Sequence, residues 1–305
     1  MINYRVAAYI TAYKDEQAIK KCLEYIAKQS YPIEKVFILD NSPGSIPLDE
    51  YENLIIKHCP ENLGIGAGLA MALLWSIKTE YDFLWSFDQD SYPTKDCLKT
   101  LLISYEKLVL RKYSIGIIAA TPIEMKSQKK IGGAIYNGKK FIEHKPDNQL
   151  QPFECDALIT SGSLISLSAA KTIALPKAEL FIDGVDLDYC MRLQKNNFRH
   201  FIVPQALMYH NFGNPVLVNF LGNQKTVYLY SALRRYYICR NHTHLEINYA
   251  QGWHRIVTSL ERLKFMFKQI ATILIYEPEQ KLTKIWACCL GTYDGFIGKL
   301  GKTWQ

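Results

Sequence analysis

Short apolar runs alternate with amphipathic periods through residues 5–210. Continuous apolar runs, typical of buried strands, recur at 5–10, 35–40, 54–56, 81–88, 114–120, 155–166 and 201–210. Between them, apolar residues spaced by three and four predict helices at 16–30, 64–78 and 95–110 and from residue 185. Strands that alternate with helices predict right-handed parallel βαβ units. The pattern therefore predicts an α/β fold.

Two stretches depart from this alternation. Residues 121–155 are polar and rich in turn formers, which indicates hairpins or a mobile flap. Near the C-terminus, apolar residues follow a 4-3-4-3-4 spacing, with basic residues beside or opposite them, and predict a basic amphipathic helix. The apolar positions are Ile256, Leu260, Leu263, Phe267, Ile270 and Leu274. Such a face suits a membrane surface, a second copy of the chain, or docking on the rest of the protein.

The distribution of charge also separates the C-terminal third from the rest of the chain. Residues 199–305 carry 13 Lys and Arg against 5 Asp and Glu, so they hold the whole basic excess of a chain with net charge +7. Basic residues interleaved with Tyr, as in 233–240, favour an anionic membrane surface. We expect no nucleic-acid partner, because no helix-turn-helix, RNP or zinc pattern occurs. We therefore expect one domain over 1–215 and a basic helical region over 216–305.

Composition places the protein in a broad class. A chain of 305 residues with 49% hydrophobic and 21% charged residues predicts a folded globular protein. Its eight cysteines lack a Cys-x-x-Cys spacing and fall mostly inside apolar patterns, which indicates reduced thiols in a cytosolic protein. The N-terminus lacks the pattern of an export signal, and no window of about 18 uncharged apolar residues predicts a membrane span.

The main candidate for chemistry is the carboxylate pair Asp88 and Asp90, which ends the apolar run of residues 81–88. Residues two apart in an extended chain project to the same side, so both carboxylates can reach one divalent cation that bridges a diphosphate. A solvated turn would use the same residue types. His210 ends a later predicted strand, and we expect it to be a third metal ligand.

Other strand ends add polar groups. Thr11, Tyr13 and Asp40 follow the first two predicted strands, where ligands of α/β sheets bind, although Asp40 would also suit a turn. The glycines from Gly64 onward begin a helix and allow close approach of a phosphate. Ser161 and Gly162 interrupt a later strand, and a glycine there often marks close approach by a ligand.

A second acidic cluster comprises Asp183, Asp186 and Asp188. Carboxylates in the first turn of a helix are favoured by the helix dipole, which alone would account for them. One of them facing a partly dry cleft could instead act as a general base. Asp183 is expected to cap the helix, and Asp188 lies about 200° around the helix from Asp186.

In order along the chain, these motifs resemble the family 2 glycosyltransferases with the GT-A fold, and within them the bacterial rhamnosyltransferase-like group. The resemblance covers most of residues 4–240. The strings that carry it are Ile10-Thr-Ala-Tyr-Lys14, Ile38-Leu-Asp-Asn-Ser42, Asn62-Leu-Gly64, Phe87-Asp-Gln-Asp-Ser91, Thr160-Ser-Gly-Ser163, Phe181-Ile-Asp-Gly-Val-Asp186 and Arg235-Tyr-Tyr-Ile-Cys-Arg-Asn241. It implies a doubly wound mixed sheet with a helical C-terminal extension.

The resemblance also implies roles for residues. Asp186 would be the catalytic base, matching the second letter of the family's Glu-Asp motif, and Val185 replaces the Glu. Asp88 and Asp90 would form the metal-binding Asp-x-Asp motif. The donor site would comprise Thr11, Tyr13, Asp40, Asn62, Gly64, Asp88 and Gln89, and the acceptor site Ser161, Gly162 and Asp188.

The expected activity is an inverting, metal-dependent transfer from a nucleoside-diphosphate sugar, with Mg²⁺ or Mn²⁺ as cofactor. By resemblance the donor is dTDP-rhamnose and the acceptor a lipid-linked saccharide for bacterial surface polysaccharide. We expect a cytoplasmic enzyme held peripherally on the inner leaflet, with a homodimer as the second use of the basic helix. Alternatives are a haloacid-dehalogenase-like phosphohydrolase, whose Asp-x-Asp normally closes the first strand, and an inactive nucleotide-sugar-binding subunit.

Overall fold

The computed structural model describes residues 2–48, 53–145, 150–220 and 223–304, and the chain forms two compact units. The first unit comprises Met1–Ile135, Glu143–Ala178 and Val185–His210. The second comprises Tyr136–Ile142, Glu179–Gly184 and Asn211–Gln305. We describe each unit by itself. The domain boundary expected at residue 215 stays a prediction.

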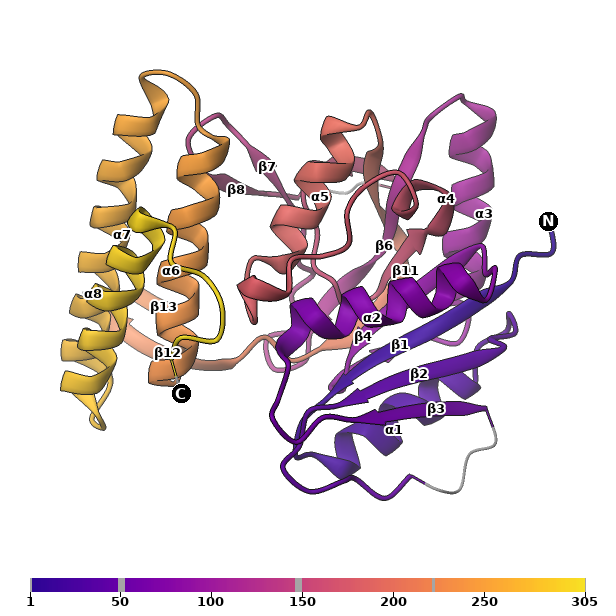
Figure 1. The fold of residues 1–305 in the computed structure, drawn as a ribbon, viewed down its shortest axis with the longest axis horizontal. Coiled ribbons are helices and arrows are strands. Elements are labelled where there is room, and N and C mark those ends of the chain that lie inside the picture. The colour runs from indigo at the N-terminus through magenta and orange to yellow at the C-terminus, as the bar shows by residue number, and fades with distance from the viewer. Residues whose placement is uncertain (1, 49–52, 146–149, 221–222, 305) are drawn as a thin grey trace. The chain divides into compact units, whose positions relative to one another are not determined.

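The first unit is built on a nine-stranded mixed sheet in the order β3-β2-β1-β4-β10-β6-β11-β5, with β9 also paired to β11 (Figure 1). Strands β1, β2, β3 and β4 are mutually parallel, and β10 runs antiparallel between β4 and β6. The strands are β1 (Val6–Ala12), β2 (Lys35–Asp40), β3 (Leu54–His58), β4 (Phe83–Asp88), β5 (Ser91–Pro93), β6 (Ile115–Glu124), β9 (Phe153–Cys155), β10 (Ser163–Ser166) and β11 (Arg199–His210). The expected α/β fold with a mixed sheet is confirmed.

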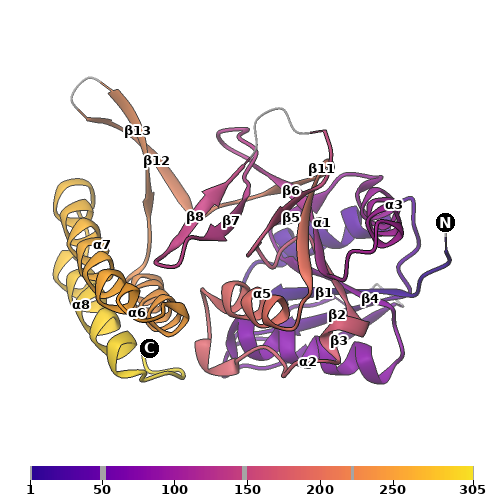
Figure 2. The ribbon, with the colours of Figure 1, turned by 90° about the horizontal axis from the view of Figure 1, so that it is seen from above.

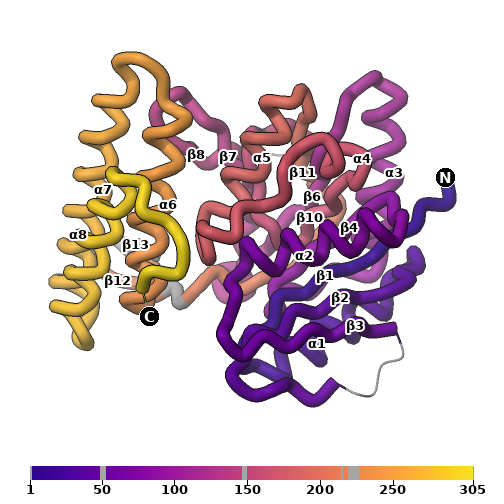
Figure 3. Tube along the Cα trace, viewed as in Figure 1, coloured from indigo at the N-terminus to yellow at the C-terminus, as the bar shows by residue number. Residues whose placement is uncertain are grey.

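Helices cover this sheet where the amphipathic periods predict them. They are α1 (Glu16–Ala27), α2 (Gly64–Lys78), α3 (Cys97–Leu110), the short α4 (Leu167–Ala170) and α5 (Val185–Lys195), and Figure 3 traces their connections to the strands. Helix α1 starts at Asp15, whose carboxylate accepts a hydrogen bond from the Ala18 N–H at 2.9 Å. This N-cap satisfies one of the amide groups that a helix start leaves without a partner.

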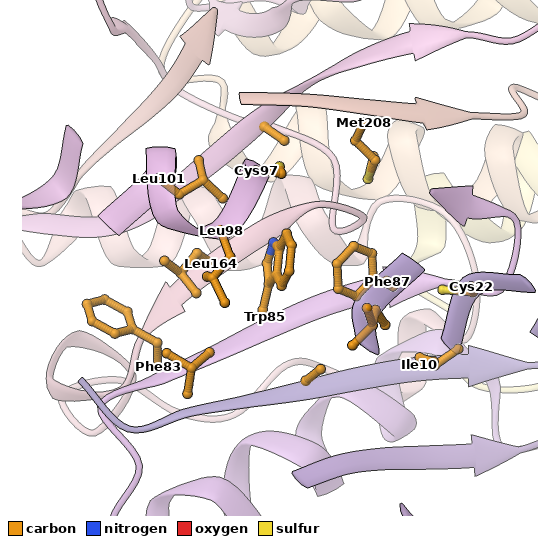
Figure 4. Close-up of a cluster of buried hydrophobic side chains, with 14 of the residues drawn as sticks. Ile10, Cys22, Phe83, Trp85, Phe87, Cys97, Leu98, Leu101, Leu164 and Met208 are labelled. Atoms are coloured by element: carbon orange, nitrogen blue, oxygen red, sulfur yellow. The ribbon is translucent and has the colours of Figure 1, made fainter. Parts of the chain in front are cut away.

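The core of the first unit lies along β4, whose side chains are almost entirely buried on both faces. Figure 4 shows Trp85 and Phe87 of this strand close to Ile10 of β1, and their two rings are 4.5 Å apart at the centroids. Leu98 and Leu101 of α3 belong to the same cluster. A strand buried on both faces reads as a continuous apolar run, which is why the sequence pattern located it.

Parallel pairing brings polar residues to one edge of this sheet. In the register of β1 with its neighbours, Thr11 pairs with Asp88 on β4, and Ala12 pairs with Asp40 on β2. The carboxyl ends of parallel strands meet at the same edge, which is where open α/β sheets bind ligands. The fold therefore gathers the expected donor and metal residues of these three strands at one edge.

The stretch expected to contain hairpins does contain one. Strands β7 (Gly133–Tyr136) and β8 (Phe141–His144) form a two-stranded sheet. Residues 146–149 of this stretch lie outside the described residues. A second hairpin, β12 (Asn214–Phe220) with β13 (Asn223–Leu229), is an extended ribbon of the second unit in Figure 2, and the sequence pattern did not predict it.

Three helices form the rest of the second unit: α6 (Ala232–Tyr249), α7 (His254–Tyr276) and α8 (Lys281–Ile297). Helices α6 and α8 pack with their backbones close together. A Cβ added to Gly291 would lie 2.4 Å from the Tyr236 carbonyl oxygen, and one added to Gly295 would lie 2.4 Å from that of Arg240. Glycine at these two positions of α8 therefore permits the close approach.

The interior of the second unit contains several polar side chains that are hydrogen-bonded or ion-paired. Arg235 and Arg240 of α6 are almost fully buried. Arg235 pairs with the buried carboxylate of Glu277. Arg240 donates hydrogen bonds to the carbonyl oxygens of Glu179 and Leu180, which belong to the short 3₁₀ segment Ala178–Leu180. The Asn241 side-chain amide donates to the carbonyls of three residues in the same stretch, namely Leu180, Ile182 and Asp183. Buried arginines and amides need such partners, so these bonds fix the segment Glu179–Gly184 on α6.

Candidate functional site

Three side chains converge at the carboxyl edge of the sheet. The donor atoms of Asp88, Asp90 and His210 all lie within 4.8 Å of one another. His210 Nε2 is 3.9 Å from Asp88 Oδ2, and His210 Nδ1 is 3.5 Å from Asp90 Oδ1. Asp88 ends β4, Asp90 follows two residues later, and His210 ends β11. The three residues predicted from strand ends more than a hundred residues apart are therefore brought together.

Strand pairing explains how His210 reaches the carboxylates. The three-residue strand β5 pairs antiparallel with β11, and in that register His210 stands opposite Ser91. A register irregularity between Val203 and Leu207 redirects β11 on its way to this end. Such an extra stretch of chain bends a strand and re-aims its side chains. The position of His210 beside Asp88 and Asp90 thus depends on backbone pairing between distant strands.

A buried hydroxyl network supports this cluster. Ser91 Oγ lies 2.8 Å from His210 Nδ1 and 2.5 Å from Ser161 Oγ. Ser161 in turn accepts a hydrogen bond from the Asp88 backbone N–H at 3.0 Å. With Nδ1 engaged by Ser91, the ring turns Nε2 toward Asp88. Outer hydrogen bonds of this kind orient metal-binding imidazoles.

The donor set fits a divalent cation. The two carboxylates suit Mg²⁺ or Mn²⁺, which prefer oxygen ligands, and the imidazole is a usual ligand of transition metals. The carboxylates are about one third exposed, whereas the His210 side chain is 9% exposed. The cluster is therefore anchored on its protein side and open toward solvent, where a diphosphate could complete the coordination.

The Tyr13 loop is tied to the metal cluster through Gln89. The Gln89 side-chain carbonyl accepts a hydrogen bond from the Tyr13 N–H at 2.6 Å, and its amide donates to the Tyr13 carbonyl oxygen at 3.0 Å. These two bonds use both ends of the Gln89 amide. The Tyr13 ring is 42% exposed, and the Lys14 ammonium lies 4.9 Å from its centroid. Gln89 thus positions the loop, and the ring of Tyr13 stays accessible.

Other expected donor residues are engaged in local structure. The Asp40 carboxylate is fully buried and accepts hydrogen bonds from the backbone N–H groups of Ser42 and Ile46, both at 2.9 Å. Asn62 adopts φ +52° and accepts a bond from the Gly64 N–H at 3.0 Å, at the start of α2. Thr11 Oγ1 lies 2.6 Å from the hydroxyl of Tyr9. Their assignments to the donor site stay predictions, and Asp40 shapes the turn after β2.

The second acidic cluster separates into three environments. Asp188 is 2% exposed and forms ion pairs with Lys177 at 2.9 Å and with Arg192 at 2.7 Å. Asp186 is only partly buried and lines a void of about 10 Å³, roughly the size of one water molecule, together with Thr160 and Tyr189. Asp183, in the second unit, lies 3.4 Å from Arg234. Only Asp186 combines partial exposure with a place in the first turn of α5.

Two of these observations bear on predicted roles. Both oxygens of Asp188 are held by basic side chains, so this geometry gives no support to its predicted role in acceptor binding. Helix α5 begins at Val185, directly after Gly184, and Asp183 has φ +63° and lies 3.4 Å from Arg234, so its expected role as the helix cap stays a prediction. The predicted roles of Ser161 and Gly162 toward an acceptor remain predictions, since the Ser161 hydroxyl contacts Asp88 and Ser91.

Sequence reasoning did not single out Ser91. Its hydroxyl is buried and joins His210 to Ser161. The available signal was the serine directly after the Asp-x-Asp motif, but serine is so common where strands end that the residue type alone did not indicate a role. The predicted reduced thiols agree with the structure, because all eight cysteines are free and seven are buried.

Comparison with known proteins shows which family the chain resembles. Residues 8–158 match the model of "Glycosyl transferase family 2". The whole chain is 24% identical over 308 residues to the dTDP-rhamnosyl transferase RfbF of Shigella flexneri, covering 98% of both chains. The phosphohydrolase alternative finds no support in these matches.

Solved structures share the fold. Staphylococcus aureus TarS aligns with a TM-score of 0.54 at 16% identity, over 93% of this chain and 48% of TarS, so the chain spans about half of that protein. A TarS fragment in complex with UDP-GlcNAc aligns with a TM-score of 0.51 at 17% identity, over 93% of this chain and 79% of the fragment. GalNAc-T7 with UDP, GalNAc and Mn²⁺ aligns with a TM-score of 0.56 at 11% identity, over 90% of this chain and 58% of that chain.

These likenesses agree with the sheet order and with the acidic edge described above. The first unit is a GT-A fold, and helices α6, α7 and α8 follow it in the chain. The chain therefore carries a glycosyl transferase family 2 domain, and we identify it as a glycosyltransferase.

Proposed function

We propose that the protein transfers rhamnose from dTDP-rhamnose to a saccharide acceptor carried on a lipid, in the synthesis of a bacterial surface polysaccharide. The full-length similarity to a dTDP-rhamnosyl transferase supports the donor. The observation that carries the proposal is the cluster of Asp88, Asp90 and His210 at the carboxyl edge of a GT-A sheet. The complexes of a TarS fragment with UDP-GlcNAc and of GalNAc-T7 with UDP, GalNAc and Mn²⁺ support a nucleoside-diphosphate donor.

Asp88, Asp90 and His210 would hold Mg²⁺ or Mn²⁺. A bound cation would neutralise charge on the departing diphosphate. The three side chains supply two carboxylates and one imidazole, and Ser91 and Ser161 keep them in place. Because the carboxylates are partly exposed on one side only, they would present the cation to a donor that arrives from solvent.

The nucleoside would lie over the loops after β1 and β2. Tyr13 offers an exposed aromatic face that Gln89 holds in position. Thr11 and Asn62 would contribute polar contacts, and the start of α2 at Gly64 would face a phosphate. Asp40 would act indirectly, by fixing the turn that its two hydrogen bonds close.

Asp186 would act as the general base of an inverting single displacement. In such a reaction the acceptor hydroxyl attacks the anomeric carbon opposite the diphosphate and gives its proton to a carboxylate. Asp186 is the accessible carboxylate of α5, whereas the oxygens of Asp188 are engaged by Lys177 and Arg192. Of the two carboxylates, Asp186 is therefore the more exposed to an acceptor.

We place the enzyme on the cytoplasmic face of the cell membrane, where a lipid-linked acceptor would be available. Among the described residues no helix is long and apolar enough to cross a membrane. We propose that the helices of the basic C-terminal region bind the membrane surface peripherally. Formation of a homodimer is the second candidate use of these helices. An inactive nucleotide-sugar-binding subunit would keep the same side chains, so an activity assay separates it from the enzyme.

The test is a panel of nucleoside-diphosphate sugars, each assayed with Mn²⁺ for release of the nucleoside diphosphate. We expect dTDP-rhamnose to be turned over fastest, and the Asp90→Ala variant to lose metal-dependent turnover while it keeps the native circular dichroism spectrum. Turnover of another sugar would correct the donor and leave the chemistry intact. No turnover of any donor by the native protein would support the inactive-subunit alternative.

A further inference from the structure

Helix α7 buries a face of mixed polar and apolar residues, against which Phe265, Met266 and Ile270 are also partly buried, and it leaves an apolar stripe exposed. The buried residues are Thr258, Arg262 and Ile273, and Arg262 forms an ion pair with Glu246 of α6 at 3.4 Å. The exposed apolar residues, between 37% and 63% exposed, are Ile256, Leu260, Leu263, Phe267, Leu274 and Ile275, and we call them the apolar stripe of α7. Trp253, directly before the helix, is 71% exposed. Exposed apolar surface this continuous marks an interaction site in soluble proteins.

The charges beside this stripe are mostly positive. Arg255, Lys264 and Lys268 are exposed on α7, and Lys299 and Lys302 follow α8. The acidic residues of the same region are fewer: Glu277 and Asp294 are buried, Glu261 is already paired with Lys140 and Lys264, and Glu279 is exposed. The surface therefore combines apolar side chains with a net positive charge, as membrane-surface helices do.

Helix α8 repeats the pattern on a smaller scale. Leu282, Trp286, Tyr293 and Ile297 are exposed and follow a 4-7-4 spacing, which places them on one face of the helix. The opposite face buries Cys288, Gly291 and Gly295 against α6. Trp and Tyr are the side chains enriched where a membrane meets water. Two neighbouring helices of the second unit thus leave apolar stripes without a partner among the described residues.

A second copy of the chain fits this surface less well than a lipid does. A twofold dimer would place the same patch on itself, so the basic residues of the two copies would meet like charges. A nucleic acid would satisfy the lysines but would leave the leucines and Phe267 exposed to a polar ligand. An anionic bilayer satisfies both features, because its headgroups attract Lys and Arg and its interface accepts apolar side chains.

We propose that the apolar stripe of α7, flanked by Lys264 and Lys268, docks the protein on an anionic lipid bilayer, with the exposed stripe of α8 as a second contact. Helix α7 would lie in the plane of the interface, and its buried face would stay packed inside the second unit. This inference deepens the proposed location of the enzyme, and it requires neither the donor nor the metal.

The test is sedimentation of the full-length protein with vesicles of phosphatidylethanolamine and phosphatidylglycerol, without substrate. We expect binding at low salt that weakens at high salt, and little binding to phosphatidylcholine vesicles. The double variant Leu260→Asp with Phe267→Asp should weaken binding about tenfold or more for each side chain. The double variant Lys264→Gln with Lys268→Gln should weaken it about fivefold for each cation and reduce the salt dependence.

The matched control is Leu110→Asp, which changes an 83% exposed leucine of α3 in the first unit and should leave binding unchanged. Circular dichroism would show that each variant folds. Equal binding by the native protein and the Leu260/Phe267 variant would overturn the proposal. Absence of vesicle binding, together with a dimer that this variant dissociates in light scattering, would also overturn it and make the face an interface between copies. Vesicle binding without any sugar transfer would leave the docking inference standing while the proposed function fails.

Discussion

Helices α1 and α7 both have amphipathic sequences, but the apolar stripes that these sequences predict lie in different environments. The apolar side of α1, including Ile19, Cys22 and Leu23, is buried on the sheet of the first unit. The apolar stripe of α7 is exposed, and the helix buries a different face that contains Thr258, Arg262 and Ile273. A periodic sequence therefore predicts that a helix has an apolar face, but it does not predict what covers that face.

The same contrast holds for the two units, each taken by itself. The first unit has an apolar interior along β4 and collects its polar side chains at the carboxyl edge of the sheet. The second unit buries Arg235, Arg240 and Glu277 beside its apolar clusters and leaves other apolar side chains exposed. We infer that the polar edge of the first sheet serves chemistry and that the buried ion pair of the second unit serves structure.

The largest effect should come from Asp186→Asn, which keeps the shape of the side chain and removes its basicity. We expect transfer to fall by about 10²–10⁴-fold, the usual contribution of a placed general base. Donor binding and thermal stability should stay native. Near-native transfer by this variant would show that another group takes the proton. Asp188→Asn should instead lower the stability, because it leaves Lys177 and Arg192 without their carboxylate.

Glu277→Gln should show that polar groups inside the second unit are structural. The change leaves Arg235 buried without its opposite charge, which typically costs about 3–5 kcal/mol of unfolding free energy. Urea unfolding would measure this loss. The matched control is Glu279→Gln, an exposed glutamate two residues later, which should change stability by less than about 0.5 kcal/mol. Similar effects of the two variants would contradict the contrast between the units.

A matched pair of apolar truncations sharpens the comparison of α1 with α7. Ile19→Ala removes a fully buried side chain and should cost about 2–5 kcal/mol of unfolding free energy. Phe267→Ala removes a larger side chain that is 63% exposed, and it should cost less than about 0.5 kcal/mol. Chemical denaturation of both variants gives the comparison. A large loss for Phe267→Ala would mean that the stripe is covered in solution.

A smaller, pH-dependent effect should come from His200 of β11. Burial lowers the pKa of this histidine, whose Nε2 lies 2.9 Å from the Cys190 carbonyl oxygen. Below the ordinary pKa of about 6.5, the unfolded chain binds the proton and the folded chain resists it, so stability falls as the pH drops. One such group contributes at most about 1.4 kcal/mol per pH unit. His200→Gln should remove this part of the slope between pH 7 and pH 5, and an unchanged slope would exclude His200 as its source.

Much of the fold was predictable because the local apolar patterns of the first unit agree with the strands and helices that it forms. The apolar runs located β1, β2, β4 and β6, and the three-and-four periods located α1, α3, α5 and α7. The hairpin of β12 and β13 was missed, because its stability depends on pairing between two segments and not on a local period. The exposure of the apolar stripe of α7 was not predictable either, because the helix packs through another face, on which Arg262 pairs with Glu246, eight residues before the helix starts.

The candidate site was predictable at the level of residue types. Strand ends indicated Asp88, Asp90 and His210, and the structure brings them together. The buried state of Asp188 was not predictable, because Lys177 lies eleven residues away in an irregular stretch and only its folded path reveals the ion pair. The clamp that Gln89 forms on Tyr13 depends on β1 and β4 lying side by side, which the sequence does not specify by itself.

The most direct test of the central claim is calorimetric titration of dTDP-rhamnose into the protein with and without Mn²⁺. If Asp88, Asp90 and His210 hold the metal that meets the donor, Mn²⁺ should strengthen donor binding by the native protein and have no such effect on Asp90→Asn. Asp96→Asn makes the same charge change at an exposed position before α3 and should behave like the native protein. An equal Mn²⁺ effect in the native protein and Asp90→Asn, or donor binding by the native protein that ignores Mn²⁺, would contradict the account.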